Sequence, residues 1–410
     1  MDRRFLVGLL FVLPATASAD EAPANGRLTL TVRETAGIRR GSDMASVELP
    51  LGRPVRDTDH FRLLENGKPI TAQFRPVRSG SEPASSAYLD FIVNAGPLEK
   101  RTYTVEYGPE VTPGPEPNRG LKVESGEETI KVSYPGGLAF VISRNLFGLL
   151  RRVGGRETDF VQAGSPGLLL RTRDGTDLRI GDSGDEPAVA KVTRSGPFAV
   201  GLRFESAKKL PRGRPIASVV DMEFPVTKSW VRITWNVRDP QKDIEGIGME
   251  LRLNAPYAPV LVDFGAGSYV YAALRKDEVA TLRAGRLDPA KADRPAWETF
   301  RGPAGALRPY VVARPDDRRR AEGWAHVMDR QRCTAVAVEG FAEAGQEAEL
   351  TADTTGRLRV WRKFASEGKS APKRLSLWLH FVGVPVQVGA ATSPQAMLAP
   401  LRVEIQPASR

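Results

Sequence analysis

Apolar and polar residues alternate most regularly over residues 216–239. Every second position is apolar along a first arm, 220–224, and again along a second arm, 231–238, and the residues 225–229 between them are rich in turn formers. A period of two is typical of a β-strand with one buried and one wet face. The segment therefore predicts a long antiparallel hairpin closed by a turn at 225–229.

The register of this hairpin follows from the same pattern. Apolar residues face one another across the two strands only if the paired residue numbers sum to an odd value, so Met222 pairs with Val231 or with Ile233. In either register Arg232 lies opposite an acidic residue of the first arm. The middle of the chain is thus predicted to belong to a large sheet with a dry inner face and a charged outer face.

Other short strands, separated by turn signals, follow one another along most of the chain. Asn66-Gly67 favours the tight turn of a hairpin, and only residues 394–401 have the composition of a helix. The Pro-rich segment 109–118 is typical of a stiff linker and marks a domain boundary. We therefore predict an all-β protein with a small barrel-like N-terminal domain, residues 20–108, and a large antiparallel β-sandwich, residues 119–410.

The first nineteen residues have the three parts of a secretory signal peptide. Arg3-Arg4 form the basic part, residues 5–13 the apolar part, and Ala17-Ser18-Ala19 the cleavage site. Cleavage after Ala19 predicts a secreted or periplasmic protein, and an uncleaved membrane anchor is the alternative. No later segment is long and apolar enough to span a bilayer, so no membrane span is expected after cleavage.

The formal net charge of +10 favours an acidic polysaccharide or an anionic envelope as a partner. The charges are interspersed along the strands, however, and the one dense basic run, 318–320, is interpreted as a solvated loop, so nucleic acid is not expected. Cys333 is the only cysteine, which excludes an intrachain disulfide. Its strand-like surroundings indicate a small buried side chain rather than a nucleophile.

Several short segments, spread in order over the chain, carry a resemblance to a known family. In the first domain they are Val47-Glu48-Leu49-Pro50, Phe61-Arg62-Leu63-Leu64, Ile70 to Pro76 and Tyr88-Leu89-Asp90-Phe91. In the second domain they are Ser143 to Val153, Ala163 to Leu168, Gly323 to Asp329, Ala337 to Phe341 and Gly356 to Val360. With these segments the chain resembles the exo-rhamnogalacturonan lyase family, also called YetA-like.

This resemblance implies a RIFT-barrel domain followed by a central β-sandwich, which is similar in kind to the supersandwich of galactose mutarotases. Members of the family continue into a large helical (α/α) toroid, whereas this sequence ends at Arg410 without a helical repeat. The resemblance therefore implies a carbohydrate-associated scaffold. It does not imply that lyase chemistry is retained, because a fold alone does not carry a function.

Two Trp/His pairs are candidates for sugar binding. Trp324 and His326 share one face of a predicted strand, and Trp378 and His380 share one face of another. An aromatic ring beside an imidazole can form a platform for a sugar with a polar group at its edge. The preferred alternative is a core or half-buried pair with a satisfied imidazole. That preference reverses if the two strands are neighbours on the concave face of the sandwich.

Glu250 and Arg252, which share another strand face, are weaker candidates. The guanidinium could bind a uronate carboxylate, although a surface charge pair is more common. The acid-rich stretch from Asp174 to Glu186 could hold calcium, but its spacing fits no loop with a fixed ligand order. The sequence contains no complete dinucleotide, phosphate-loop, nucleophile-elbow or zinc-protease motif, so no metal, cofactor or catalytic residue is assigned.

Three functions therefore remain open. The first is a non-catalytic or accessory module that binds a poly- or oligosaccharide, acidic ones included. The second is a polysaccharide lyase or mutarotase-like enzyme that uses the concave face near Trp324 and His326. The third is an assembly partner that receives a toroid-bearing chain at the sandwich surface. An open groove with exposed aromatic side chains would favour the first, a pocket shared by a His and a carboxylate the second, and a large apolar patch the third.

Overall fold

In the computed structural model the chain is described over residues 25–78, 82–155, 158–182, 185, 187–210, 215–285, 295–314, 319–343, 345–365, 373–383 and 393–407. The predicted signal peptide lies outside these residues, and so does Glu186. Antiparallel strands make up nearly all of the described secondary structure, with one short helix, α2 (Ser393–Leu398), so the prediction of an all-β sandwich protein is confirmed. Within the described ranges no helix has the length and apolar character needed to cross a membrane.

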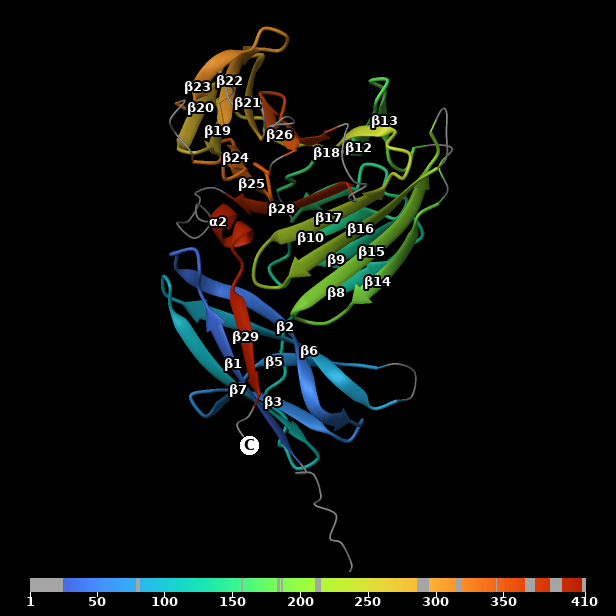
Figure 1. Ribbon diagram of the computed structural model, residues 1–410, viewed down its shortest axis with the longest axis vertical. Helices are drawn as coiled ribbons and strands as arrows, with labels where there is room; N and C mark the ends of the chain where they lie inside the picture. The colour runs from blue at the N-terminus through green and yellow to red at the C-terminus, as the bar shows by residue number, and fades with distance from the viewer. Residues whose placement is uncertain are drawn as a thin grey trace, which may run out of the picture.

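Two antiparallel sheets around one apolar core form the N-terminal unit, at the bottom of Figure 1. The five-stranded sheet consists, in order, of β29 (Arg402–Pro407), β1 (Gly26–Arg33), β7 (Lys100–Gly108), β3 (His60–Glu65) and β4 (Lys68–Ile70). The three-stranded sheet consists of β2 (Arg40–Val55), β6 (Ala84–Ala95) and β5 (Ala72–Val77). Asn66 and Gly67 have φ values of 51° and 76°, which confirms the predicted tight turn between β3 and β4.

The last strand of the chain returns to this N-terminal unit. β29 pairs with β1, with Thr31 opposite Glu404, and Val403 and Ile405 pack against the N-terminal core. The predicted boundary differs, because it assigned all of residues 119–410 to the sandwich. Alternation identifies a strand, but it does not say which sheet edge the strand joins, since every edge offers the same unpaired backbone groups.

Truncation after Pro400 should therefore destabilise the N-terminal unit, although the deleted residues are more than 290 positions away from β7 in the sequence. The truncation removes three partly buried aliphatic side chains, Leu401, Val403 and Ile405, and leaves the β1 edge unpaired, so we expect a loss of about 3 kcal/mol or more. Amide hydrogen exchange in β1 and β7 measures this loss. Deletion of residues 408–410 alone is the control, and unchanged protection of β1 after the longer truncation would contradict the prediction.

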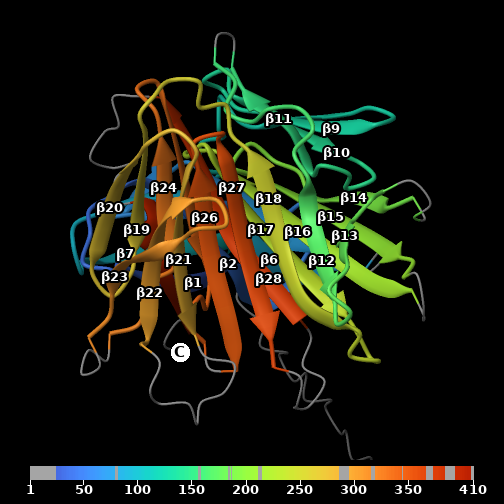
Figure 2. The same cartoon turned by 90° about the horizontal axis from the view of Figure 1, so that it is seen from above.

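The sandwich consists of a nine-stranded and an eight-stranded antiparallel sheet, and Figure 2 shows the eight-stranded sheet in front of the nine-stranded one. The nine-stranded sheet contains, in order, β14 (Val189–Arg194), β15 (Ala199–Lys208), β16 (Ile216–Pro225), β17 (Trp230–Arg238), β28 (Lys373–Gly383), β25 (Arg332–Val338), β24 (Trp324–Met328), β19 (Val260–Gly265) and β20 (Tyr269–Leu274). The eight-stranded sheet contains β13 (Asp177–Arg179), β12 (Gly167–Thr172), β18 (Ile244–Arg252), β27 (Arg357–Phe364), β26 (Gln346–Asp353), β21 (Glu278–Gly285), β22 (Trp297–Pro303) and β23 (Arg308–Val312).

A separate four-stranded sheet shares the core of the sandwich. Its strands are, in order, β11 (Leu150–Gly154), β10 (Ala139–Ser143), β9 (Thr129–Ser133) and β8 (Lys122–Ser125). Phe140 of β10 meets Phe224 of β16 edge to face, with ring centroids 5.3 Å apart. The small sheet therefore extends the main core rather than forming a core of its own.

The strands β16 and β17 form the predicted hairpin. Met222 lies opposite Ile233, which is one of the two registers that the alternation allows. Both side chains are buried in the main core, as is Trp235. On the other face Arg232 lies opposite Glu223, so the expected pairing of Arg232 with an acidic residue is confirmed.

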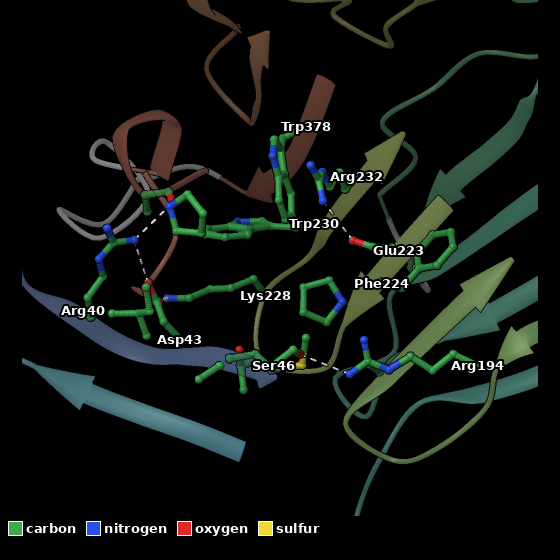
Figure 3. Close-up of a pocket in the computed structure, with 18 of the residues that line it drawn as sticks. Arg40, Asp43, Ser46, Arg194, Glu223, Phe224, Lys228, Trp230, Arg232 and Trp378 are labelled. Carbon is green, nitrogen blue, oxygen red and sulfur yellow. Dashed lines mark hydrogen bonds and ion pairs between the residues drawn. The ribbon is translucent and has the colours of Figure 1, made fainter. Parts of the chain in front are cut away.

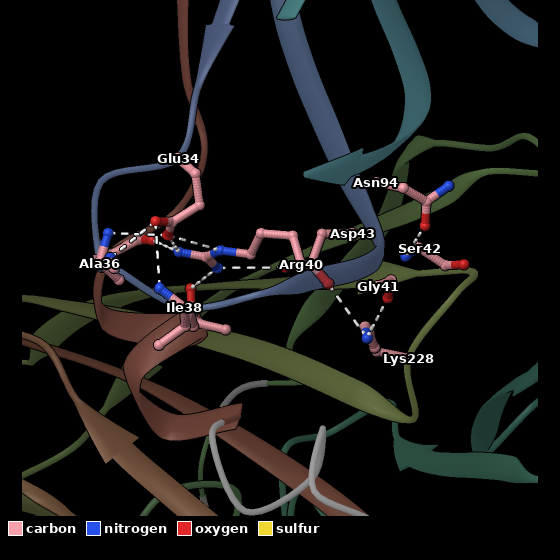
Figure 4. Close-up of polar contacts among 12 residues, drawn as sticks. Glu34, Ala36, Ile38, Arg40, Gly41, Ser42, Asp43, Asn94 and Lys228 are labelled. Carbon is pink, nitrogen blue, oxygen red and sulfur yellow. Dashed lines mark hydrogen bonds and ion pairs between the residues drawn. The ribbon is translucent and has the colours of Figure 1, made fainter. Parts of the chain in front are cut away.

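A buried ion-pair network joins the N-terminal unit, the sandwich and α2 (Figure 4). Arg40 places Nε and Nη2 at 3.1 and 2.9 Å from Glu34 Oε1, and its Nη1 donates to Asp43 Oδ2 at 3.2 Å. The same guanidinium donates to two main-chain carbonyls at the end of α2. Lys228, in the turn of the central hairpin, pairs with Asp43 Oδ1 at 3.2 Å. Arg40 thus connects the N-terminal unit to α2, and Asp43 connects it to the central hairpin through Lys228.

Hydrogen bonds keep the Glu34 carboxylate of this network charged. Burial by itself would raise the pKa of Glu34, but its hydrogen bonds overcome that effect and lower the pKa to about 2. The donors are the main-chain N–H groups of Leu98, Ala36, Gly37 and Ile38 together with the Arg40 guanidinium. Glu34 is therefore ionised at neutral pH.

Candidate functional site

Two neighbouring rows of side chains cross the outer face of the nine-stranded sheet, which is the face turned away from the main core. One row runs from β17 to β19 through Arg232, Trp378, Ala337, Trp324 and Gly265. The other runs beside it through Trp230, His380, Ala335, His326 and Asp263. The two predicted Trp/His pairs therefore lie on one face, but their strands are not neighbours, because β25 lies between β24 and β28.

Strand alternation places these polar and aromatic groups on the outer face. Leu377 and Leu379 of β28 are buried in the main core, so Trp378 and His380 must point to the opposite side. Between the two Trp/His pairs, β25 presents Ala335 and Ala337 to this face, with Cys333 next to them at the start of the strand. The small alanines leave a groove between the two pairs.

The helix α2 occupies this groove. Ala396 and Met397 pack in one apolar cluster with Trp230 and Trp324. At the start of the helix, Ser393 Oγ lies 3.0 Å from His380 Nδ1. Residues of α2 line a pocket on each side of the helix. The helix therefore divides this face of the sheet into two pockets, each with residues of both rows, and the two pockets differ in their chemistry.

The first of these, the His326 pocket, has a volume of about 520 Å³. It gathers two carboxylates, an imidazole, a phenol, an indole and an amide from four segments, namely β19, β20, residues 322–328 and α2. The lining residues are Asp263, Gly265, Tyr269, Glu322, Trp324, His326, Met328, Cys333 and Gln395.

Asp263 fixes the orientation of His326. Its Oδ1 accepts hydrogen bonds from the backbone N–H (2.9 Å) and from the ring Nδ1 (2.8 Å) of His326. Because a carboxylate only accepts, Nδ1 carries the proton, and Nε2 is a lone-pair acceptor in the neutral ring. Among the residues that the structure describes, none is a hydrogen-bond partner of this buried Nε2. An unpaired buried acceptor costs about 1–3 kcal/mol until a donor reaches it.

Tyr269 and Trp324 give the pocket an aromatic wall. Tyr269, on the edge strand β20, is 64% exposed, and its hydroxyl donates to Asp263 Oδ2 at 3.0 Å. Partial burial and the Asp263 charge raise the pKa of Tyr269 to about 12, so this donor keeps its proton at neutral pH. The ring centroids of Tyr269 and Trp324 are 6.5 Å apart. Gly265 makes room for the indole, because a Cβ there would lie 2.0 Å from it.

The interdomain pocket, about 380 Å³ in volume, lies between the outer face and β2 of the N-terminal unit (Figure 3). Trp230 and Trp378 meet edge to face with centroids 5.7 Å apart, and the Arg232 guanidinium lies 5.5 Å from the centre of the Trp378 ring. The pocket also contains several basic side chains. Each of these forms an ion pair with a carboxylate, namely Arg40, Arg194, Lys228 and Arg232. The charges of this pocket therefore satisfy one another and join the two units.

Glu250 and Arg252 lie on the other side of the sandwich. Their neighbour Leu251 is buried in the main core, so both point to the outer face of the eight-stranded sheet. Glu250 Oε2 is 3.2 Å from Arg357 Nε, and Arg252 is exposed. The six predicted residues therefore do not form one site.

The acid-rich stretch pairs with basic side chains instead of gathering into a cation site. Asp177 accepts from Arg171 at 2.7 Å, and Asp185 lies 3.1 Å from Lys208. The hydrogen bond from Arg171 lowers the pKa of Asp177. Within the described part of the chain, no group of three or more His, Cys, Asp or Glu side chains could hold a metal ion.

Asp263, Tyr269 and Glu322 were not predicted from the sequence as members of a site. One signal existed for Asp263, since it is the only charged residue of the apolar strand β19, where a carboxylate requires a partner. Cys333 is buried at the base of the same pocket, as expected. Burial and the Asp263 charge raise the pKa of Cys333 to about 12, which is the opposite of what a nucleophile requires.

No protein-family model matches this sequence, and no curated protein matches it. Two solved structures from Enterococcus faecalis share its fold over 94% of the chain. One is an alpha-mannosidase from strain V583 with 10% identity and a TM-score of 0.56, and the other is a protein in glycosyl hydrolase family 38 with 9% identity and a TM-score of 0.54. The chain covers 46% and 48% of them, so it spans about half of their length. At this identity the likeness shows a common fold.

Proposed function

We propose that this chain is a carbohydrate-binding protein whose ligand occupies the His326 pocket. The observation that carries the proposal is the buried, unpaired Nε2 of His326, beside the exposed ring of Tyr269, in the part of the chain that the structure describes. A sugar supplies both groups that complement this arrangement. One of its hydroxyls can donate to Nε2, and its apolar ring face can stack on the phenol. The charges of the interdomain pocket, by contrast, already satisfy one another.

The similar structures support the same class of ligand. One is named as an alpha-mannosidase and the other as a member of a glycosyl hydrolase family. Because one fold can host many functions, this likeness adds to the argument from the pocket and does not replace it. Export of the protein and a relation to exo-rhamnogalacturonan lyases belong to the proposal as well. They rest on the N-terminal pattern and on the sequence segments described above.

The replacement His326→Leu tests the proposal, because leucine fills a similar volume but has no atom in place of the Nε2 acceptor. We expect the affinity for a bound saccharide to fall about 10-fold, the equivalent of one hydrogen bond of about 1–1.5 kcal/mol. Isothermal titration with saccharides selected on a glycan array measures the change. Tyr269→Ala should also weaken binding, and denaturant unfolding of the variant separates this effect from the loss of the hydrogen bond between Tyr269 and the buried Asp263.

The chain offers a matched control in His380→Leu. His380 lies in the same row of the same sheet, but its ring contacts Ser393 beneath α2 and is not among the residues that line the His326 pocket. This variant should retain the affinity of the wild type. Equal losses in the two histidine variants, or the binding of no glycan by the wild type, would refute the proposal.

A second candidate is an enzyme that transfers a proton at a sugar. Asp263 and His326 form an oriented pair, and Glu322, which accepts a hydrogen bond from Trp324 Nε1, provides a second carboxylate in the same pocket. This combination suits mutarotase-like acid–base chemistry. A uronate lyase would also need a cation for the substrate carboxylate, and the described lining contains neither Lys nor Arg. Polarimetry of freshly dissolved sugars, with Glu322→Gln as the variant, tests this candidate. An assay for unsaturated uronates tests lyase activity.

A further inference from the structure

Exposed aromatic side chains continue beyond the His326 pocket along β20. Tyr269 and Tyr271 are two residues apart on this strand and point to the same outer face. They are 64% and 44% exposed. β20 is the edge strand of the nine-stranded sheet, so the two tyrosines lie at the rim of this face. The aromatic wall of the pocket therefore opens onto a surface that is also aromatic.

The edge of the second sheet adds a third tyrosine. Tyr310 of β23 is 45% exposed, and its hydroxyl donates to the main-chain oxygen of Tyr271 at 3.1 Å. The Arg301 guanidinium lies 5.7 Å from the centre of the Tyr310 ring, and Arg301 also donates to Ala273 O at 2.6 Å. These contacts hold the two sheet edges together. They define a tyrosine strip of Tyr269, Tyr271 and Tyr310 with a fixed backbone.

The charge of the His326 pocket restricts its ligand. The described lining contains two carboxylates, Asp263 and Glu322, and it contains neither a Lys nor an Arg. A uronate would bring a third negative charge into this partly enclosed space without a cation to offset it. A sugar without a carboxylate brings only hydroxyl donors, which suit the carboxylates and His326 Nε2.

We propose that the ligand is an uncharged oligosaccharide, with one sugar in the His326 pocket and the following sugars stacked on Tyr271 along β20. This inference rests on the proposed function and adds the charge, the minimum length and the direction of the ligand. Residues two apart on a strand are about 6.5–7 Å apart, a distance that neighbouring sugars of an extended chain can bridge. Tyrosine suits this role because its ring is apolar while its hydroxyl stays wet.

The test measures affinity against ligand length by isothermal titration. The probes are manno-, galacto- and gluco-oligosaccharides of one to six sugars, together with oligogalacturonates of the same lengths. For the wild type, affinity should rise from one to about four sugars. Tyr271→Ala should lower the affinity for the tetrasaccharide about 10-fold and that for the monosaccharide less than about 2-fold. Tyr271→Phe should behave like the wild type, and oligogalacturonates should bind at least about 10-fold more weakly.

The outcomes separate this inference from the proposed function. If Tyr269→Ala and His326→Leu weaken binding as expected but affinity does not depend on length or on Tyr271, the proposed function stands and the extended ligand is refuted. Oligogalacturonates that bind as tightly as the neutral series refute the uncharged ligand. If sedimentation shows that the wild type self-associates and that Tyr271→Ala dissociates it, the tyrosine strip is a protein interface, and the inference is overturned.

Discussion

The replacement Glu34→Gln is expected to lower the free energy of unfolding by about 3–5 kcal/mol, which is typical of breaking a buried ion pair. The Glu34 side chain is fully buried and the Arg40 side chain is 2% exposed, so water cannot compensate for the lost charge. The amide would also turn one acceptor atom into a donor toward groups that are themselves donors. Denaturant unfolding at pH 7.5 measures the change.

The matched control is Glu124→Gln. Glu124 pairs with Lys131 at 3.1 Å, but both side chains are largely exposed, so the same substitution should change stability by less than about 0.5 kcal/mol. Arg40→Met tests the other half of the pair, and the double variant should lose less than the sum of the two single variants. A loss below about 1 kcal/mol for Glu34→Gln would show that the network does not hold the N-terminal unit and α2 together.

The second large effect concerns pH and His380. Burial, the positive charge of Lys228 and the neighbouring His326 lower the pKa of His380 to about 3. In the unfolded chain this residue is protonated as the pH falls below about 6.5, whereas in the folded protein it is protonated only near pH 3. Stability is therefore greatest above pH 6.5 and falls as the pH decreases toward 3. At pH 4.5 the loss attributable to His380 should be about 3 kcal/mol.

The variant His380→Leu isolates this contribution, because it removes the titrating ring. Between pH 7.5 and 4.5 the wild type should lose about 3 kcal/mol more than the variant, measured by denaturant unfolding at each pH. Between pH 7.5 and 9 the two curves should run in parallel, since His380 is neutral in both states there. Parallel curves over the acidic range as well would mean that the ring is accessible to protons in the folded protein.

The alternation of apolar and polar residues and the turn residues were sufficient to predict those parts of the fold that depend on residues close together in the sequence. The hairpin of β16 and β17 has the predicted strands, one of the two predicted registers and the predicted pairing of Arg232 with an acidic residue, which is Glu223. The tight turn at Asn66 and Gly67 also follows from local chemistry. In each case the residues that decide the structure are close together in the sequence. In the hairpin, a shift of the register by one residue would also place charged side chains in the core.

The candidate site was less predictable, because its members lie on separate strands. The spacing of Trp324 and His326 correctly indicated a shared face, but it could not show that Asp263 pairs with His326 from β19. It also could not show that α2 covers His380 and leaves the Nε2 of His326 without a partner in the described part of the chain. Both features depend on strand order, which alternation does not encode.

The alternation along the chain is enough to predict antiparallel sheets, since apolar and polar side chains must face the core and the solvent in turn. The order of the strands, the pairing of β29 with β1 at the other end of the chain, and the choice of which histidine faces a pocket became known from the folded structure alone. Burial of a side chain depends on the local pattern, whereas pairing between distant strands depends on which edges meet after the whole chain has folded.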